Sequence, residues 1–175
     1  MNFEELIYPL TEYLADNNFS VTNKSLHLIE YSSNFATIRI AYANLEHLLY
    51  TYVGQSSKSL IELTPTAAKE VFNDDSFQFQ STLTIDNLIS FLKGNGKSIV
   101  SGDKNAFLEL NEFSKRQSKE YTRQIIQSQN IQSADKAWIQ RDYINFIKFI
   151  DKTEKNLLPE SYLKKYKIAV YKLQI

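Results

Sequence analysis

The spacing of hydrophobic residues predicts a helix followed by strands in the first part of the chain. Between residues 3 and 16, hydrophobic side chains recur at the 3.6-residue period of a helix, at Phe3, Leu6, Ile7, Leu10 and Leu14. The period then falls to two in residues 26–31, 35–43 and 46–53, and a shorter run covers residues 60–63. Short connections between these runs predict antiparallel pairing, because a parallel neighbour needs a long crossover. We therefore expect a helix on an antiparallel sheet of about four strands.

Two helix signals follow the predicted sheet. Thr64 fits the N-cap position and Pro65 the first helical position of a short helix that extends to about residue 72. Another helix is predicted over residues 84–93, and Gly94 ends it. Between the two, the segment FQFQ at residues 77–80 fits either an edge strand or an extended linker.

The chain from Asp103 onward is predicted to be wholly helical. Asp103 can cap a long helix to about Ser128, after which the polar segment QSQNIQ is expected to be a linker. Ser133 is then a candidate N-cap for a helix over residues 134–152. Residues 167–175 also alternate as a strand would, but the helical spacing that begins at Tyr162 continues through them and favours a helix. The fold class is therefore α+β, with an α+β domain at 1–102 and a helical region at 103–175 that contains a long helix and an αα hairpin.

The segment SADKAWIQRDYINFIKFI, followed by LLPESYLKKYKIAVYKL, resembles a single tetratricopeptide-type helical hairpin. Trp138, Tyr143 and Ala169 stand in places similar to the family's large, aromatic and small positions, whereas Asp142 replaces the usual Gly. The connection between the helices is also longer than the family norm. The resemblance implies an αα hairpin used in protein–protein contacts. One such unit cannot form a solenoid, so we expect the hairpin to pack on the long helix.

Composition and charge narrow the classes of function. Twenty basic residues balance twenty acidic ones, so the basic excess that nucleic-acid binding normally requires is missing. The absence of cysteine rules out disulfides and thiol chemistry. The first residues, MNFEELIYPL, are acidic where an export signal would be basic, and no apolar run reaches the length of a membrane span. These features predict a cytoplasmic protein, of bacterial origin given its Asn, Lys and Ile content, with no nucleic-acid or membrane partner.

The sequence contains only the last part of a nucleotide-binding motif, and we do not expect it to bind a nucleotide. The stretch FLKGNGKSIV ends in Gly96-Lys97-Ser98, the last part of a phosphate-binding loop, but Phe91 occupies the position of the first glycine. The element order is also reversed, because a predicted helix comes before the glycines. We therefore interpret the glycines as a helix C-cap and a turn, and expect no cofactor.

The residues offer little for catalysis. The only histidines, His27 and His47, lie on predicted strands without the close spacing of a metal site. The acid pairs Glu109 with Glu112 and Asp74 with Asp75 could in principle serve a glycosidase, but solvated surface acids explain them better. Neither a catalytic site nor a metal site is predicted.

A mixed aromatic and charged surface is the strongest functional candidate. Tyrosine is enriched in binding surfaces because its body is apolar and its hydroxyl polar, and the chain contains 11 tyrosines. Four residues are predicted to bind a protein partner if one face of the sheet is left uncovered: Arg39, Tyr50, Tyr52 and Glu62. The alternative is that Tyr50 and Tyr52 pack beneath the first helix.

The sequence therefore favours a non-enzymatic protein-binding module. In layout, its first hundred residues are similar to small bacterial immunity proteins and to secretion-chaperone-like folds, although architecture alone does not determine function. We expect an immunity-type inhibitor that covers the active site of a toxin. An adaptor or secretion chaperone that holds a polypeptide segment is one alternative, and a carboxylate-dependent hydrolase is another. The oligomeric state and the identity of the partner stay open.

Overall fold

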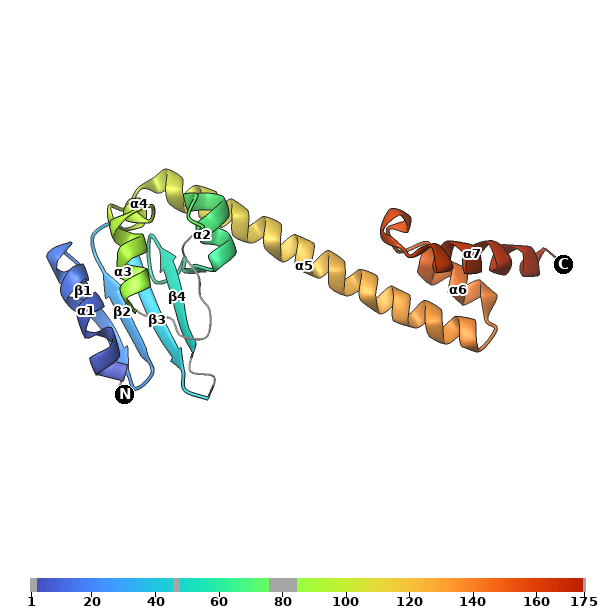
Figure 1. Cartoon of the computed structure of the whole chain (residues 1–175), viewed down its shortest axis with the longest axis horizontal. Coiled ribbons are helices and arrows are strands. Elements are labelled where there is room, and N and C mark those ends of the chain that lie inside the picture. Colours follow the sequence, from blue (N-terminus) through green and yellow to red (C-terminus); the bar gives the residue numbers. More distant parts are fainter. Residues whose placement is uncertain (1–2, 46–47, 76–84, 175) are drawn as a thin grey trace. The chain divides into compact units, whose positions relative to one another are not determined.

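The chain forms an α+β structure, as expected. The computed structural model describes residues 3–45, 48–75 and 85–174. Two compact units are present, Met1–Lys115 and Arg116–Ile175, and the division falls inside the long helix α5 (Lys104–Ile139). The first unit contains the sheet, and the second contains helices (Figure 1).

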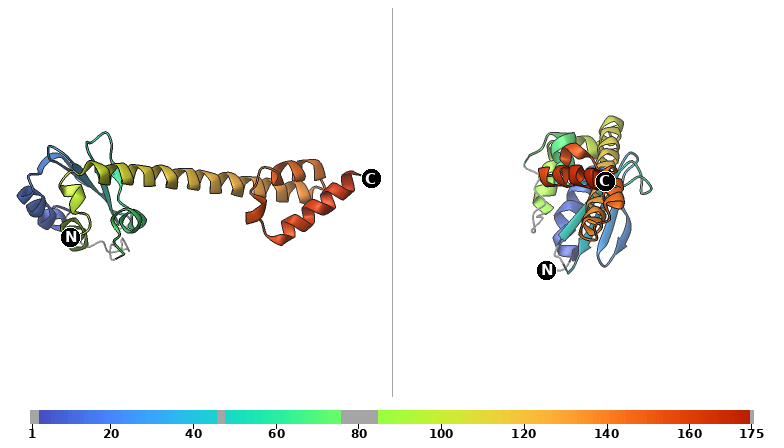
Figure 2. Two further views of the ribbon diagram at one scale, coloured as in Figure 1. Left: turned by 90° about the horizontal axis from the view of Figure 1, so that it is seen from above. Right: turned by 90° about the vertical axis from the view of Figure 1, so that its right-hand side faces the viewer.

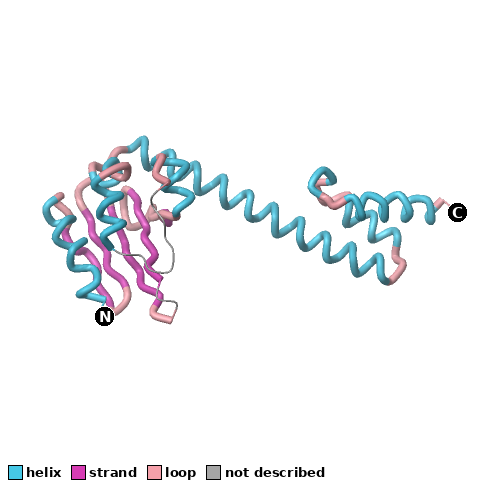
Figure 3. Tube along the Cα trace, in the orientation of Figure 1, coloured by secondary structure: helices cyan, strands magenta, loops and turns pink. Residues whose placement is uncertain are grey.

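The sheet of the first unit is a five-stranded antiparallel meander. Its strands follow one another in chain order, so that each pairs with the next (Figure 3). They are β1 (Ser20–Ser25), β2 (Leu28–Ser32), β3 (Thr37–Ala43), β4 (Leu48–Gly54) and β5 (Ile61–Glu62). The predicted antiparallel pairing is confirmed, and one strand is added to the expected number.

The added strand is the edge strand β1. All six of its residues are exposed. Because neither face of this strand enters the core, its sequence, SVTNKS, needs no alternation of hydrophobic and polar positions and shows none. It is held by pairing with β2, which is interrupted by an irregularity between Val21 and Asn23. Bulges of this kind are common at sheet edges, where they discourage pairing with another chain.

Helix α1 (Phe3–Asp16) is confirmed and covers one face of the sheet. It buries the predicted residues Phe3, Ile7, Leu10 and Leu14, while Leu6 is partly buried. Helix α3 (Ile85–Lys93) lies beside α1 in front of the strands (Figure 1). Both helices contribute to one hydrophobic core with the sheet residues Ile29, Tyr31, Ile38, Ile40 and Val53.

Helix α2 (Pro65–Phe72) begins where its capping residues predict. The Thr64 hydroxyl accepts a hydrogen bond of 3.1 Å from the backbone N–H of Ala67. Asn73 ends the helix in the left-handed region with φ of 54°, a conformation that asparagine tolerates better than most residues. The segment predicted at residues 77–80 lies outside the described residues.

Helix α5 corrects two predictions about the C-terminal part. It is continuous over 36 residues, so the predicted linker QSQNIQ and the N-cap at Ser133 are wrong. Glutamine is a good helix former, and a polar helix segment needs no apolar stripe where solvent surrounds it. The helix ends instead near Arg141, whose φ is 60°, and the predicted single helix over residues 134–152 is therefore divided.

The second unit is a small helical assembly. Asp142 caps helix α6 (Tyr143–Ile150) by accepting a 3.0 Å hydrogen bond from Asn145 N–H. A 3-10 turn, η1 (Lys155–Leu157), leads to α7 (Glu160–Leu173), which confirms the helical reading of residues 167–173. Helices α6 and α7 lie side by side (Figures 1 and 2). The core of this unit consists of Ala134, Ala137, Phe146, Ile150, Leu158 and Ala169.

Candidate binding surface

A row of polar and aromatic side chains crosses the sheet from β2 to β5. Strand pairing places Glu30 opposite Arg39, Arg39 opposite Tyr52, and Tyr52 opposite Glu62. Directly paired residues point to the same side of a sheet, so these four side chains share one face. Three of them, Arg39, Tyr52 and Glu62, were predicted to bind a partner. We call the face that carries this row, together with Tyr50, the polar face.

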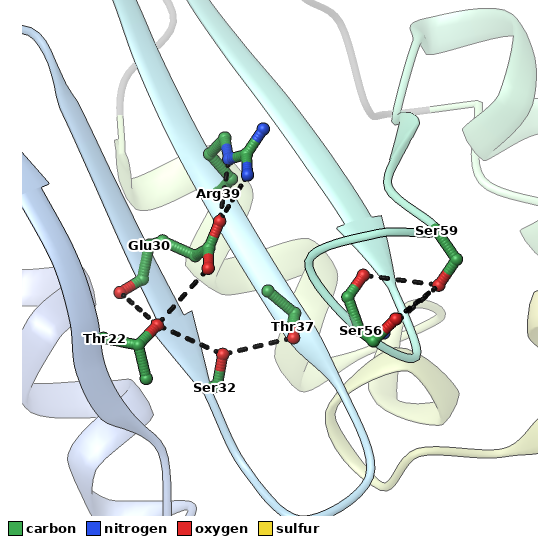
Figure 4. A network of polar contacts seen from close by, with 7 residues as sticks. All are labelled: Thr22, Glu30, Ser32, Thr37, Arg39, Ser56 and Ser59. Atoms are coloured by element: carbon green, nitrogen blue, oxygen red, sulfur yellow. Dashed lines mark hydrogen bonds and ion pairs between the residues drawn. The ribbon is translucent and has the colours of Figure 1, made fainter.

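The polar face lies opposite the helices of the first unit. Side chains alternate along β3, so that Ile38 and Ile40 enter the core while Arg39 points the other way. Figure 4 views the sheet from the side of Arg39 and Glu30, with α2 beside the strands and other helices behind them. Within the described part of the chain, the polar face is therefore open to a partner protein.

An ion pair anchors the centre of the polar face. Arg39 donates from Nε and Nη2 to Oε2 of Glu30, at 2.9 and 2.6 Å. Glu30 is only 6% exposed, and a carboxylate taken out of water requires such a partner. In Figure 4 the other terminal nitrogen of Arg39 points away from Glu30. The pair thus holds the guanidinium in place and leaves part of it facing outward.

A hydroxyl network supports Glu30 from the side of β1. Thr22 donates to Glu30 Oε1 at 3.4 Å and lies 3.2 Å from the hydroxyl of Ser32 (Figure 4). Ser32 in turn lies 3.1 Å from the hydroxyl of Thr37. These contacts run across three strands and restrict the side chains around the ion pair. No role for Glu30 was predicted from the sequence, although a Glu in an otherwise apolar strand indicates a buried pair.

Tyr52 lies between the two charged ends of the row. Burial raises the pKa of its hydroxyl, the Glu62 carboxylate raises the pKa further, and Arg39 acts in the opposite direction. The hydroxyl therefore keeps its proton at neutral pH and can both donate and accept a hydrogen bond. Tyr52 is half-buried, so part of its side chain remains available for contact.

Tyr50 occupies the same face, two residues before Tyr52. Its position on β4 is opposite Ala41 of β3, and its side chain is half-buried. The aromatic contact of α1 is made instead by Phe3, whose ring stacks on Tyr42 at a centroid distance of 5.9 Å. The alternative that Tyr50 and Tyr52 pack beneath the first helix is therefore wrong.

The candidates for catalysis are scattered. Among the described residues, no group of three His, Asp or Glu side chains could hold a metal ion. His27 lies against Tyr42 at 6.3 Å between ring centroids, and His47 falls outside the described residues. Asp75 pairs with Lys69 at 2.8 Å, while Glu109 and Glu112 are exposed on α5.

The glycine-rich segment forms a turn between α3 and α4 (Lys97–Val100). The backbone N–H groups of Gly94 and Gly96 donate to carbonyls of Ser90 and Phe91, at 3.0 and 2.9 Å. A Cβ at Gly96 would lie 2.3 Å from the Phe91 ring, so this glycine is required for close packing. The interpretation of these glycines as a helix end and turn is confirmed.

Comparison with known proteins adds no assignment. No helix in the described segments combines the length and apolar character needed to cross a membrane. Models of known protein families, curated proteins and solved structures were compared with the chain, and none of the three comparisons found a match. The tetratricopeptide-type resemblance and the likeness in layout to immunity proteins and secretion chaperones stay predictions.

Proposed function

We propose that this chain is a non-enzymatic protein-binding module and that the polar face is its binding surface. The observation that carries the proposal is the row Glu30, Arg39, Tyr52 and Glu62 across the sheet. Arg and Tyr are enriched in the cores of protein interfaces, where they provide both apolar area and hydrogen bonds. A sheet face needed only to meet solvent has no requirement for half-buried tyrosines beside a fixed guanidinium.

The arrangement suits a rigid partner. The Glu30–Arg39 pair positions the guanidinium before binding, so that little side-chain entropy is lost when a partner docks. Strands place Tyr50 and Tyr52 on a scaffold held by the core, and rigid elements present binding residues more accurately than loops do. Within this class we favour an immunity-type inhibitor, which would cover the active site of a toxin and block access to its substrate.

Co-purification from the native host tests this proposal. The wild-type chain is compared with a variant of the polar face, Arg39→Ala combined with Tyr52→Ala, and with a control, Tyr121→Ala, which alters an exposed residue of the second unit. We expect wild type and control to retain one protein that the polar-face variant loses. Co-expression of that protein should then slow growth unless the wild-type chain is present. Retention of the same protein by the polar-face variant would refute this use of the surface.

A second candidate function is an adaptor that holds a polypeptide segment. A groove of about 350 Å³ in the second unit favours it. Ile131 and Leu157 provide apolar surface in the groove, and the rest of its lining is polar or charged, with amides from Gln124, Gln127 and Gln132 and the charged side chains of Glu120 and Arg123. Such a lining could hold an extended segment by hydrogen bonds to its backbone. Light scattering on the purified chain distinguishes the two proposals, because we expect the adaptor to dimerise and the inhibitor to remain monomeric.

A further inference from the structure

A small pocket opens where the polar face meets the start of α2. Its volume is about 210 Å³, and its lining includes Leu48, Tyr50, Glu62, Leu63, Thr64 and Pro65. Pockets that hold whole small molecules usually measure roughly 300–1,000 Å³. This pocket is below that range, so its size suits a single long side chain better than a separate ligand.

Among the described residues, Glu62 is the only charged one in the lining of this pocket. It is exposed, and no described Lys or Arg lies within ion-pair distance of it. By contrast, Glu30 in the same row is already neutralised by Arg39. The negative field of Glu62 also acts on its surroundings, since it raises the pKa of the neighbouring Tyr52.

The rest of the lining suits the stem of a long cationic side chain. Leu48, Leu63 and Pro65 offer apolar surface beside a single carboxylate, and Arg buries its aliphatic stem along such surface while its head group finds a charge. Tyr50 adds an aromatic ring to the lining, on which a guanidinium stacks better than an ammonium group does. The lining thus matches arginine in charge and in its apolar and aromatic character.

We propose that this pocket receives an arginine side chain of the protein partner, with the guanidinium bound to the Glu62 carboxylate. The inference rests on the proposed function, because it names the chemistry of a partner at the same face. It predicts a basic partner surface, and it adds Glu62 and its apolar neighbours as an anchor point beside the row of polar residues.

A titration with a small probe tests the pocket without the partner. N-acetyl-arginine amide is added to the isotopically labelled full chain, and amide resonances are followed by NMR. The control ligand is N-acetyl-citrulline amide, which has nearly the same shape but no charge. The variant is Glu62→Gln, and Glu109→Gln is its matched control because Glu109 is also exposed and lies on α5.

We expect the arginine probe to shift resonances of residues 48–54 and 61–65 in the wild type and in Glu109→Gln. Binding should weaken about 10-fold in Glu62→Gln and with the citrulline probe, because a hydrogen-bonded charge is lost in each case. Equal binding of the two probes would overturn the inference. An unchanged affinity in Glu62→Gln would do so as well, as would the absence of shifts in these residues.

The two proposals fail in different ways. If the arginine probe binds in the pocket but the polar-face variant retains the same protein as wild type, the proposed use of the polar row fails while the arginine pocket stands. If a partner is recovered and binds Glu62→Gln as tightly as wild type, the pocket assignment fails while the protein-binding function stands.

Discussion

At the scale of single residues, one buried acid determines how the polar face is organised. Glu30 is nearly inaccessible, and its two hydrogen bonds from Arg39 compensate for its removal from water. The same pair fixes the position of the guanidinium, and strand pairing places Tyr52 beside Arg39 on the other neighbouring strand. A residue that stabilises the sheet therefore also prepares the candidate binding surface.

Removing only one member of this pair should be more harmful than removing both. Arg39→Met leaves a buried carboxylate unpaired and should lower the free energy of unfolding by about 2 kcal/mol. This loss is smaller than the usual cost of breaking a fully buried ion pair, because the Arg39 side chain is 31% exposed and water partly screens the charge. The double variant Glu30→Leu with Arg39→Met also removes the buried carboxylate, so it should lose less stability than Arg39→Met alone. Urea denaturation measures both, and a double variant less stable than the single one would contradict this account.

The second unit contains a tyrosine whose titration reports its packing. Burial, a 2.7 Å hydrogen bond to Asp135 and the charge of that carboxylate raise the pKa of Tyr162 from 10.0 to about 12. In NMR of labelled tyrosine rings, the resonance that disappears in Tyr162→Phe should therefore titrate near pH 12. Asp135→Asn should lower this pKa, because it removes the charge that opposes the phenolate. An unchanged midpoint in Asp135→Asn would contradict the assigned cause.

The direction of the resulting pH dependence follows from linkage. A pKa that is higher in the folded than in the unfolded chain gives stability that is complete below pH 10 and lost as the pH rises toward 12. Wild type should therefore lose more stability over this interval than Tyr162→Phe.

At the scale of elements, prediction succeeded where a hydrophobic pattern existed. Helix α1 and strands β2 to β4 carry clear periodicity, and Thr64 with Pro65 marks the start of α2 through its local chemistry. Strand β1 has six exposed residues and no pattern, so only its pairing with β2 reveals it. The polar segment at residues 127–132 resembled a linker because composition does not distinguish a solvated helix from a loop.

A proline substitution tests the continuity of α5. Gln129→Pro removes a backbone donor and clashes with the preceding turn, which costs roughly 3 kcal/mol inside a helix. Gln129 is exposed, so Gln129→Ala is a suitable control that should leave stability nearly unchanged. Circular dichroism and thermal unfolding of the two variants measure the effect. A proline variant as stable as the control would support the linker that the sequence predicted.

Also at this scale, the candidate surface was only partly predictable. Alternation along β3 indicated that Arg39 faces away from Ile38 and Ile40, and the tyrosines of β4 followed the same logic. Whether helices cover one face or both cannot be read from that alternation, because it depends on how distant segments pack. The register between strands, which places Tyr52 between Arg39 and Glu62, likewise became visible only in the structure.

At the scale of the whole molecule, each unit has a hydrophobic core of its own. The first combines the sheet with α1, α2, α3 and the start of α5, and the second is built around Phe146 and Ile150. Separate cores predict that the units lose their structure in separate steps. The candidate binding surface belongs wholly to the first unit, so its integrity should not depend on the second.

A core truncation in the second unit tests this independence. Phe146 is fully buried, and Phe146→Ala should cost about 3–5 kcal/mol through lost contacts and a cavity. Hydrogen exchange should then become faster in α6 and α7 but stay unchanged in β2, β3 and β4. Faster exchange throughout both units would indicate one cooperative structure instead.

The most direct test of the central claim is the affinity of Tyr52→Ala for the recovered partner, measured by calorimetry beside wild type and Tyr121→Ala. Both tyrosines keep part of their surface accessible, and only Tyr52 lies in the row across the sheet. The account predicts that Tyr52→Ala binds about 10-fold or more weakly, as expected for an aromatic residue central to an interface, while Tyr121→Ala binds as wild type does. Equal affinity of Tyr52→Ala and wild type would contradict the assignment of the polar face as the binding surface.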